Sequence, residues 1–318
     1  MRGAGARPMV VTGGAGFVGH HLVPRLLEEG DRPVVVIDDL TRGSIERLGA
    51  VLGDPRVGFL RGDATDAAFL HATFAELRPS VVFHLAAVHF IPYCVAHPAE
   101  TLRVNVIGTQ HVLDALAAVP DARLVFASTA DVYAPADRPH AEDDPIGTTN
   151  VYGASKRCCE ELFALARRLR PGGRILAARL FNVFGPGETN PHVLPDMLAC
   201  VRHGGPLRLG SLEPRRDYVH ARDVADALAR LAAYDGPEVV FNVGTGIGTS
   251  VRELVDALAE VLGRPLRVDL DPARVRRVER MQLVADVTRA RRELGWAPRV
   301  GVRDGLRDLV AREVAAVA

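Results

Sequence analysis

The chain alternates short apolar runs with longer segments that are apolar on one face. The runs are four to seven residues long and rich in Val, Ile, Leu and Phe, as in strands of a parallel sheet that is covered on both faces. They predict strands at Met9–Thr12, Pro33–Asp38, Val57–Asp63, Val81–Leu85, Leu124–Ala127 and Ile175–Arg179. Apolar residues at helical spacing predict helices at Phe17–Glu29, Thr101–Val119 and Val151–Arg170. This alternation indicates an α/β protein with a doubly wound parallel sheet.

The pattern changes after Arg179. Phe181–Pro195 is rich in Gly, Pro and Asn and predicts an ordered loop. Three further elements follow: a helix at Asp223–Ala233, a strand at Val239–Val243, and a helix at Val251–Leu262 that Ser250 and Glu253 open as a capping box. We expect residues 1–179, joined by 219–246, to form one domain, and 180–218 with 247–318 to form a smaller lobe. Ligands of doubly wound folds bind at the carboxyl edge of the sheet, where this lobe is expected.

Composition narrows the classes of function. The chain has 318 residues, enough to bury a full core, and its 39 basic and 39 acidic residues balance. It therefore lacks the basic field of a nucleic-acid-binding protein. No run of 18 apolar residues occurs, and the four cysteines do not have the spacing of a disulfide framework or a zinc site. We expect a cytoplasmic protein with no metal, no membrane association and no nucleic-acid partner.

Lys156 is the only lysine among the 39 basic residues. A lysine in a chain that otherwise uses arginine can mark a site where a flat, permanently charged guanidinium does not substitute. Tyr152 lies four residues earlier, so the two side chains share a helix face. A nearby ammonium lowers the pKa of a phenol, which predicts that Tyr152 acts as a general base near neutral pH.

A glycine pattern follows the first predicted strand, in Thr12-Gly-Gly-Ala-Gly-Phe-Val-Gly19. These glycines permit a tight turn and a close approach of the backbone to a pyrophosphate, and the helix start supplies N–H groups to the anion. Asp38 ends the second strand, where a carboxylate binds an adenosine ribose and repels a 2′-phosphate. This favours NAD over NADP. Asp63, at the end of the third strand, is a candidate for contact with the adenine amino group.

Six motifs together resemble those of the extended short-chain dehydrogenases/reductases, and among them the nucleotide-sugar epimerase/dehydratase family. In chain order they are TGGAGFVG, HLAA (His84–Ala87), STADVY (Ser128–Tyr133), YGASK (Tyr152–Lys156), RLFNVFGPG (Arg179–Gly187) and RRDYVHARDVA (Arg215–Ala225). The resemblance covers the chain from Pro8 onward. It implies a Rossmann-type domain, bound NAD, a nucleotide-diphosphate sugar as substrate with UDP favoured, and a homodimer formed by the two long predicted helices.

The resemblance also implies residue roles. Thr129 hydrogen-bonds the sugar 4-hydroxyl, Tyr152 removes its proton, and Lys156 also holds the nicotinamide ribose, while hydride passes from sugar C4 to NAD and leaves a 4-keto sugar. The implied cofactor contacts are Gly13, Gly16, Phe17, Val18, Gly19, Asp38, Asp39, Asp63, Ala64, Leu85, Ala86, Ala87, Asn105, Ser128, Tyr152 and Lys156. The implied substrate contacts are His89, Thr129, Asn182, His192, Val193, Leu207, Leu209, Arg216, Arg276 and Glu279.

Members of the family share the reaction up to the 4-keto sugar and differ in what happens next. Asp131 is the residue that bears on this difference. Ala130 argues against the dTDP-glucose type of dehydratase, and the Ser-Thr-Ala triplet resembles that of bacterial UDP-glucose 4-epimerases. Asp131 is either a base for sugar C5, as in a 4,6- or 5,6-dehydratase or a decarboxylase, or a polar support of its neighbours. We expect a 4-epimerase acting on a UDP-hexose or UDP-hexuronic acid, with those lyases as the alternative. A non-catalytic NAD-binding regulator is a more distant one.

Overall fold

The computed structural model describes residues 6–169, 174–275 and 280–313. They form two compact units. The first unit comprises Met1–Ala134, Pro145–Arg179 and Ala225–Phe241, and the second comprises Pro135–Asp144, Leu180–Val224 and Asn242–Ala318. None of the described helices is both long enough and apolar enough to cross a membrane.

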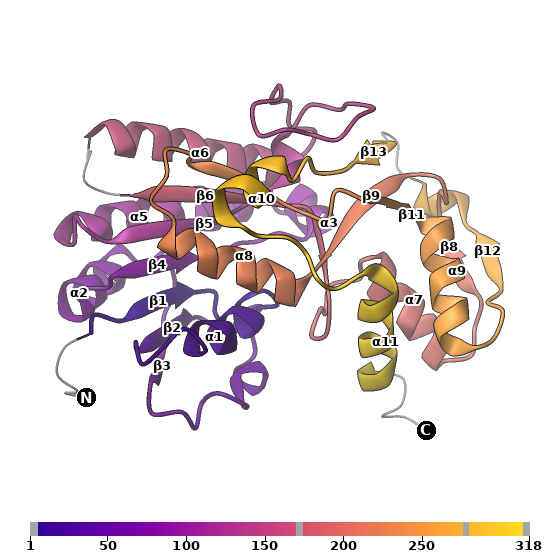
Figure 1. The fold of residues 1–318 in the computed structure, drawn as a ribbon, viewed down its shortest axis with the longest axis horizontal. Helices are drawn as coiled ribbons and strands as arrows, with labels where there is room; N and C mark the ends of the chain where they lie inside the picture. The colour runs from indigo at the N-terminus through magenta and orange to yellow at the C-terminus, as the bar shows by residue number, and fades with distance from the viewer. Residues whose placement is uncertain (1–5, 170–173, 276–279, 314–318) are drawn as a thin grey trace. The chain divides into compact units, whose positions relative to one another are not determined.

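A seven-stranded sheet forms the centre of the first unit, in the order β10-β6-β5-β4-β1-β2-β3 (Figure 1). Its strands are β1 (Met9–Thr12), β2 (Val34–Asp38), β3 (Val57–Arg61), β4 (Val81–His84), β5 (Arg123–Thr129), β6 (Ile175–Leu180) and β10 (Val240–Val243). The pairings of β1 with β2 and β4, of β2 with β3, and of β4 with β5 are parallel. The predicted doubly wound parallel sheet is confirmed. The chain order reverses at β1, which places the topological switch point there.

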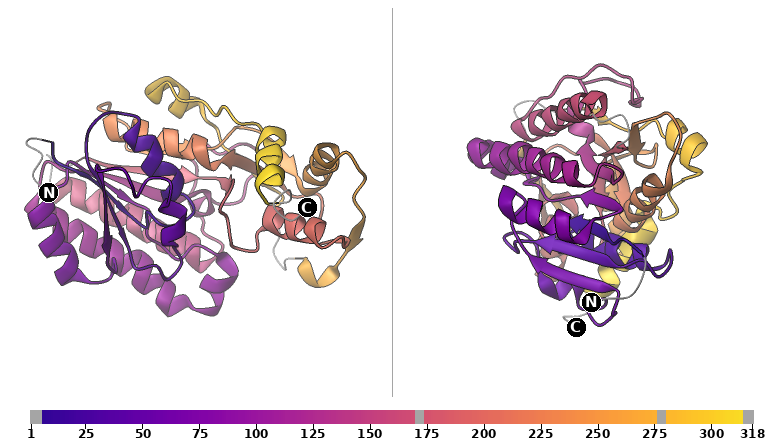
Figure 2. Two further views of the ribbon diagram at one scale, coloured as in Figure 1. Left: turned by 90° about the horizontal axis from the view of Figure 1, so that it is seen from below. Right: turned by 90° about the vertical axis from the view of Figure 1, so that its left-hand side faces the viewer.

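Helices cover both faces of this sheet. The helices of the unit are α1 (Gly19–Leu27), α2 (Ala67–Leu77), α3 (Ile91–Ala96), α4 (Pro98–Leu102), α5 (Gly108–Ala115), α6 (Val151–Leu169) and α8 (Ala221–Ala233), the last of which begins in the second unit. One group, α2, α5 and α6, lies on one side of the strands in the right-hand view of Figure 2. A core that includes Phe74, Val112, Phe126 and Phe163 joins these helices to the sheet. On the other face, Arg25 of α1 pairs with Asp226 of α8 at 2.9 Å.

Two predictions for this unit differ from the structure. The helix expected at Thr101–Val119 is divided into α4, a π-helical turn at Arg103–Ile107, and α5. Asn105 lies within that turn, and its side chain binds the main chain of Val88 rather than packing along a regular helix. Helix α2 was not predicted from the apolar pattern. Asp66 caps it by accepting a hydrogen bond from the main-chain nitrogen of Phe69 at 3.0 Å.

Among its described residues, the second unit contains two small sheets, four complete α-helices, a 3-10 helix (Pro272–Arg274) and the first residues of α8. Its elements are β7 (Asn182–Phe184), α7 (Val193–Arg202), β8 (Leu207–Leu209), β9 (Arg215–His220), β11 (Gly248–Ser250), α9 (Val251–Leu262), β12 (Val268–Leu270), β13 (Gln282–Leu283), α10 (Thr288–Leu294) and α11 (Val302–Glu313). The capping box of Ser250 and Glu253 is confirmed. The prediction of a loop throughout Phe181–Pro195 is wrong in part, because Asn182–Phe184 forms a strand that pairs with β9.

Candidate active site

The turn between β1 and α1 has a backbone that only glycine fits. Gly13 has φ +71°, and a Cβ there would lie 2.6 Å from the main-chain nitrogen of Ala86. A Cβ at Gly19 would lie 2.5 Å from the main-chain oxygen of Gly13. Helix α1 begins directly after Val18, and no side chain caps it. The glycines therefore allow the turn and the start of α1 to pack closely on their neighbours, and the uncapped helix start has main-chain N–H groups that suit an anionic group such as a pyrophosphate.

Asp38 lies at the end of β2 beside this turn. Its carboxylate is 6% exposed and accepts hydrogen bonds from the main-chain nitrogens of Ala15 at 3.0 Å and Leu40 at 2.9 Å. Gly43 also approaches closely, since a Cβ there would lie 2.7 Å from an Asp38 oxygen. Burial raises the pKa of Asp38, whereas its two main-chain donors lower it. The neighbouring Asp39 is exposed and accepts a hydrogen bond from Thr41. A buried carboxylate beside a glycine turn fits the adenosine ribose of a dinucleotide.

Other predicted cofactor residues fix the main chain around the ends of β3, β4 and β5. Asp63 accepts a hydrogen bond from the main-chain nitrogen of Thr65 at 2.7 Å, and Ala64 is buried. Asn105 accepts from Val88 N at 2.8 Å and donates to Val88 O and to Ser155 Oγ, both at 2.9 Å. The amide group of Asn105 is therefore occupied by protein partners and holds the segment that follows Ala87.

The predicted catalytic residues of the first unit lie together. Thr129 ends β5 and is 5% exposed, and Tyr152 is the second residue of α6. The Thr129 hydroxyl is close enough to the Tyr152 phenol to lower its pKa. Gly153 permits the close packing of α6 on the Thr129 segment, because a Cβ there would lie 2.5 Å from the main-chain oxygen of Asp131. A hydroxyl and a phenol are thus held side by side at the carboxyl edge of the sheet, where ligands of this fold bind.

Asp131 is a direct partner of this pair. Thr129 Oγ1 donates to Asp131 Oδ2 at 3.4 Å, and Asn150 Nδ2 donates to Asp131 Oδ1 at 3.3 Å. Asn150 also accepts a hydrogen bond from the main-chain nitrogen of Gly153 at 2.8 Å, in the first turn of α6. Asn150 was not singled out from the sequence. Its place two residues before Tyr152, at a helix start where asparagine is a common cap, was the available signal.

Lys156 lies one turn after Tyr152 on α6 and is 2% exposed. Its Nζ donates to the main-chain oxygen of Ala127 at 2.8 Å and lies 4.4 Å from the centre of the Phe126 ring. Burial lowers the pKa of Lys156 to about 8. Its charge, together with burial, also lowers the pKa of His84 to about 3, so His84 is neutral.

The prediction that Lys156 lowers the pKa of Tyr152 is wrong for the protein without bound cofactor or substrate. Burial, and then the negative charge of Asp131, raise the pKa of Tyr152 above its ordinary value, whereas the hydrogen bond with Thr129 lowers it. Lys156 directs its ammonium to Ala127 and Phe126 and has a reduced affinity for its own proton. The spacing put the two side chains on one helix face, but burial and a third residue set the pKa of the phenol.

A buried ion pair next to the catalytic residues was also missed. Glu160 and Arg179 side chains are 5% and 4% exposed and 2.8 Å apart. Glu160 also accepts a hydrogen bond from Ser128 Oγ at 2.6 Å, and Arg179 lies over the ring of Tyr133, 4.7 Å from its centre. The pair therefore holds both ends of the segment that carries Thr129 and Asp131. Glu160 follows Lys156 by four residues, which was a signal that the two share a helix face.

The second unit carries most of the predicted substrate residues. Asn182 opens β7, His192 is the residue before α7, and Val193 is its first residue. The side chains of Leu207 and Leu209 are buried in the hydrophobic core of the unit, so they are not open for contact with a base. Arg216 on β9 is half-buried and donates to the main-chain oxygens of Arg215 and Arg280. Arg276 and Glu279 lie outside the described residues.

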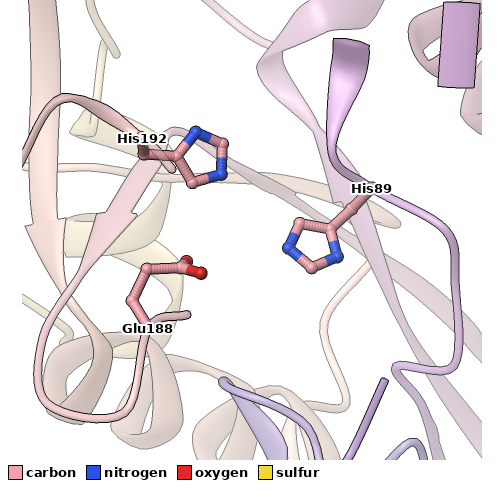
Figure 3. Close-up of side chains that lie close together, drawn as sticks. All are labelled: His89, Glu188 and His192. Atoms are coloured by element: carbon pink, nitrogen blue, oxygen red, sulfur yellow. The ribbon is translucent and has the colours of Figure 1, made fainter. Parts of the chain in front are cut away.

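The loop before α7 brings two ionisable side chains of this unit together. Figure 3 labels them as Glu188 and His192, and it also labels His89, which belongs to the first unit. Glu188 accepts hydrogen bonds from the main-chain and side-chain nitrogens of Asn190, at 2.8 Å and 3.1 Å. The carboxylate is therefore used to shape the loop that places His192 at the start of α7.

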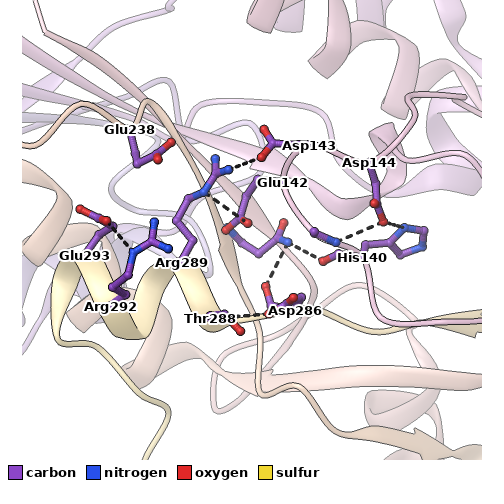
Figure 4. Close-up of polar contacts among 12 residues, drawn as sticks. His140, Glu142, Asp143, Asp144, Glu238, Asp286, Thr288, Arg289, Arg292 and Glu293 are labelled. Carbon is purple, nitrogen blue, oxygen red and sulfur yellow. Dashed lines mark hydrogen bonds and ion pairs between the residues drawn. The ribbon is translucent and has the colours of Figure 1, made fainter.

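A polar network anchors Pro135–Asp144 in the second unit (Figure 4). Asn242 donates from Nδ2 to the main-chain oxygens of His140 at 2.7 Å and Asp286 at 3.2 Å. Its main-chain nitrogen donates to Glu142 Oε1 at 2.9 Å, and Arg289 lies 3.6 Å from the other carboxylate oxygen. This anchored segment lies in the sequence between Asp131 and Tyr152. The segments that carry Asp131 and Tyr152 are thus joined in the sequence by residues that belong to the second unit.

Comparison with known proteins identifies the family of the chain. Residues 9–244 match the model of the NAD dependent epimerase/dehydratase family. A UDP-glucose 4-epimerase of Mycolicibacterium smegmatis is 36% identical over 306 residues, which cover 93% of this chain and 95% of that protein. The solved structure of a Thermotoga maritima UDP-glucose 4-epimerase with UDP-glucose has a TM-score of 0.90 and 29% identity, over 98% of this chain and 100% of that one. The Thermus thermophilus UDP-glucose 4-epimerase complex with NAD has a TM-score of 0.84 and 32% identity, covering 98% of each chain.

Proposed function

The chain belongs to the NAD-dependent epimerase/dehydratase family, and we propose that it is a nucleotide-sugar 4-epimerase acting on a UDP-hexose or UDP-hexuronic acid. The observation that carries this proposal is the placement of Thr129 at the end of β5 next to Tyr152 on α6, with Lys156 one turn further along that helix. The similarity to proteins named UDP-glucose 4-epimerase supports UDP as the nucleotide and a hexose as the sugar.

The residues of the first unit fit a bound dinucleotide. Glycine at position 13 lets the turn pack against Ala86, the start of α1 lacks a side-chain cap, and Asp38 presents a buried carboxylate at the end of β2. Asp38, with the turn, would hold the adenosine half, and Lys156 would hold the nicotinamide ribose. NAD, when bound, supplies the acceptor for a hydride from sugar C4 and can return it.

Tyr152 and Thr129 manage the proton in this mechanism. The Thr129 hydroxyl orients the sugar 4-hydroxyl, and Tyr152 takes its proton as the C4 ketone forms. Tyr152 later returns the proton to C4–O after the sugar has presented its opposite face. Since the pKa of Tyr152 is raised in the protein alone, loss of the phenol proton limits the rate at lower pH. Lys156 stays buried beside this group and keeps a positive charge available below its pKa of about 8.

The second unit is proposed to bind the nucleotide diphosphate. Arg216 offers a planar guanidinium suited to phosphate, and Asn182, His192 and Val193 are proposed to line the rest of this surface. Arg276 and Glu279 are proposed to bind phosphate and ribose, in keeping with the family resemblance.

Asp131 is tied to the residues on either side of the proposed catalytic pair. Both of its carboxylate oxygens accept hydrogen bonds, from Thr129 and Asn150. These contacts hold Asp131 beside Thr129 and leave further lone pairs on both oxygens. We propose that Asp131 positions Thr129, and the similarity to proteins named UDP-glucose 4-epimerase favours the epimerase over the lyase alternative.

The reaction is tested by incubating the protein with a panel of nucleotide sugars and measuring product masses. An epimerase gives a product of unchanged mass that separates from its substrate, with UDP-glucose or UDP-glucuronic acid as the expected substrate. Loss of water or of carbon dioxide would instead establish a dehydratase or a decarboxylase. The Tyr152→Phe variant, which keeps the ring, controls for contaminating activity.

A homodimer is also proposed, formed through the helices of the first unit. Exposed apolar side chains lie on α4, the π-helical turn and α6: Leu102 at 44%, Ile107 at 48% and Leu165 at 53%. Such side chains favour a second burial partner. Light scattering should give twice the mass of one chain, and Leu165→Glu should give a monomer, whereas Leu52→Glu should not. A monomeric wild-type protein at micromolar concentration contradicts the proposal.

The proposed compartment is the cytoplasm, and the four free cysteines fit its reducing conditions.

A further inference from the structure

Two segments flank the glycine turn on opposite sides. The first follows β2, and the second follows β4, and these two strands are the neighbours of β1 in the sheet. The main-chain nitrogen of Ser44 in the first segment donates to Ala15 O of the turn at 3.0 Å. In the second segment, Ala86 N is so close that a Cβ at Gly13 would lie 2.6 Å away. The turn therefore lies between these segments and touches both of them.

Three side chains join the two segments. Arg42, four residues after Asp38, lies in the first segment, and Tyr93 and Glu100 lie in the second. Arg42 Nη2 lies 3.2 Å from Glu100 Oε1, and Tyr93 donates from its hydroxyl to Glu100 Oε2 at 2.7 Å. The guanidinium carbon of Arg42 lies 4.1 Å from the centre of the Tyr93 ring. We call these three residues the clasp.

The contacts of the clasp reinforce one another. Both oxygens of Glu100 are used, one by a cation and one by a phenol. The hydrogen bond from Tyr93, with the charge of Arg42, lowers the pKa of Glu100, so this carboxylate is ionised at neutral pH. Arg42 and Glu100 are 38% and 36% exposed, and an isolated ion pair of that exposure contributes little. A flat guanidinium that is paired and also stacked on a ring is held in one orientation.

Because the clasp links the segments on both sides of the turn, it closes a ring of protein across the carboxyl end of β1. We propose that Arg42, Tyr93 and Glu100 form a clasp that retains the bound dinucleotide and sets its rate of release. A molecule seated at the turn leaves only when the contacts between Arg42 and the pair of Tyr93 and Glu100 open. Retention suits an enzyme that uses its cofactor as both acceptor and donor within one turnover.

This inference rests on the proposed binding of NAD, and its test measures release rather than catalysis. The protein is loaded with isotopically labelled NAD and diluted into a large excess of unlabelled NAD, and the retained label is followed by rapid gel filtration. Arg42→Ala and Glu100→Gln should each raise the release rate about tenfold, and Tyr93→Phe, which keeps the stacked ring, should raise it less. Arg303→Ala is the control, since Arg303 forms an exposed pair with Glu260 in the second unit. It should release NAD at the wild-type rate.

The charge-reversed double variant, Arg42→Glu with Glu100→Arg, tests whether the pairing itself retains the cofactor. Its release rate should return to within about threefold of wild type. Release rates within twofold of wild type in both Arg42→Ala and Glu100→Gln would overturn the clasp, and so would a double variant as fast as the single ones. These results would leave the proposed function intact, because the protein would still bind NAD. A wild-type protein that neither contains nor takes up NAD would overturn both proposals.

Discussion

Replacing Asp131 with asparagine removes one negative charge beside the catalytic phenol and keeps the shape of the side chain. Burial is the larger cause of the raised pKa of Tyr152, and the charge of Asp131 is the second. The hydroxyl of Thr129 contacts Asp131 on the side of Tyr152. A negative charge disfavours the phenolate, so its removal lowers the pKa of Tyr152. The phenolate is the form that takes the proton. The acid limb of the rate profile should therefore move to lower pH in Asp131→Asn.

The size of this shift follows from Coulomb's law. Two unit charges about 6 Å apart interact by roughly 3 kcal/mol at an effective dielectric constant of about 20, which corresponds to about two pH units. Asp131 is only half-buried, so solvent screens its charge, and we expect a shift of about one pH unit. Below the pKa of Tyr152 the variant should then be up to about tenfold faster than wild type, because one pKa unit is a factor of ten in the phenolate fraction.

The assay is the pH dependence of kcat, measured with saturating substrate and NAD. Other groups near Tyr152 do not account for a difference between the two proteins. Burial raises the pKa values of the Cys94 and Cys159 thiols, and Lys156, with a pKa of about 8, titrates in both proteins alike. Glu161→Gln, a change on the exposed side of α6, is the matched control and should leave the profile in place. An unmoved profile in Asp131→Asn would refute the electrostatic reasoning. Loss of activity at every pH would instead make Asp131 a proton-transfer group.

Three other predictions concern the same site. Tyr152→Phe should lower turnover about 10²–10⁴-fold with little change in unfolding temperature, and Lys156→Arg should also be impaired; more than a tenth of wild-type turnover in Tyr152→Phe contradicts its role as the base. The purified protein should release NAD on denaturation, detected by chromatography, and a preference for NADP would be incompatible with the role of Asp38. Glu160→Gln should lower the free energy of unfolding by about 3–5 kcal/mol in urea titrations, because it removes the charged partner of a buried guanidinium. Glu260→Gln, an exposed control, should change it by less than about 0.5 kcal/mol.

The central sheet could be predicted from the sequence because its strands are buried on both faces. Met9–Thr12 and Val34–Asp38 are buried throughout, and such strands have unbroken apolar runs, here interrupted only at their last residue. Strand β7 was missed because its three residues form a strand only by pairing with β9. Asn182 pairs with Tyr218, which lies thirty-six residues later in the chain. Such a contact leaves no local pattern. The π-helical turn was missed for a related reason, since it depends on the side chain of Asn105 reaching Val88.

The sequence placed Tyr152 and Lys156 on one helix face, but it did not predict the pKa of Tyr152. The spacing of Tyr152 and Lys156 is a local property of a helix, so it could be read directly. The pKa of Tyr152 depends on burial and on Asp131, which is twenty-one residues away in the chain, and neither is visible in that spacing. The pairing of Glu160 with Arg179 likewise joins α6 to β6. Charge effects at a buried site depend on the full set of neighbours, and only the fold defines that set.

The single lysine acquires a physical reason from its surroundings. Position 156 is 2% exposed, with one main-chain acceptor at 2.8 Å and an aromatic ring at 4.4 Å. A compact ammonium meets both with a single nitrogen, whereas a guanidinium would bury several N–H donors with one acceptor to satisfy them. Burial also lowers the pKa of the amine to about 8, a response that a guanidinium does not have in this range. The surroundings of position 156 therefore suit a lysine better than an arginine, although Lys156 is the only lysine among the 39 lysine and arginine residues of the chain.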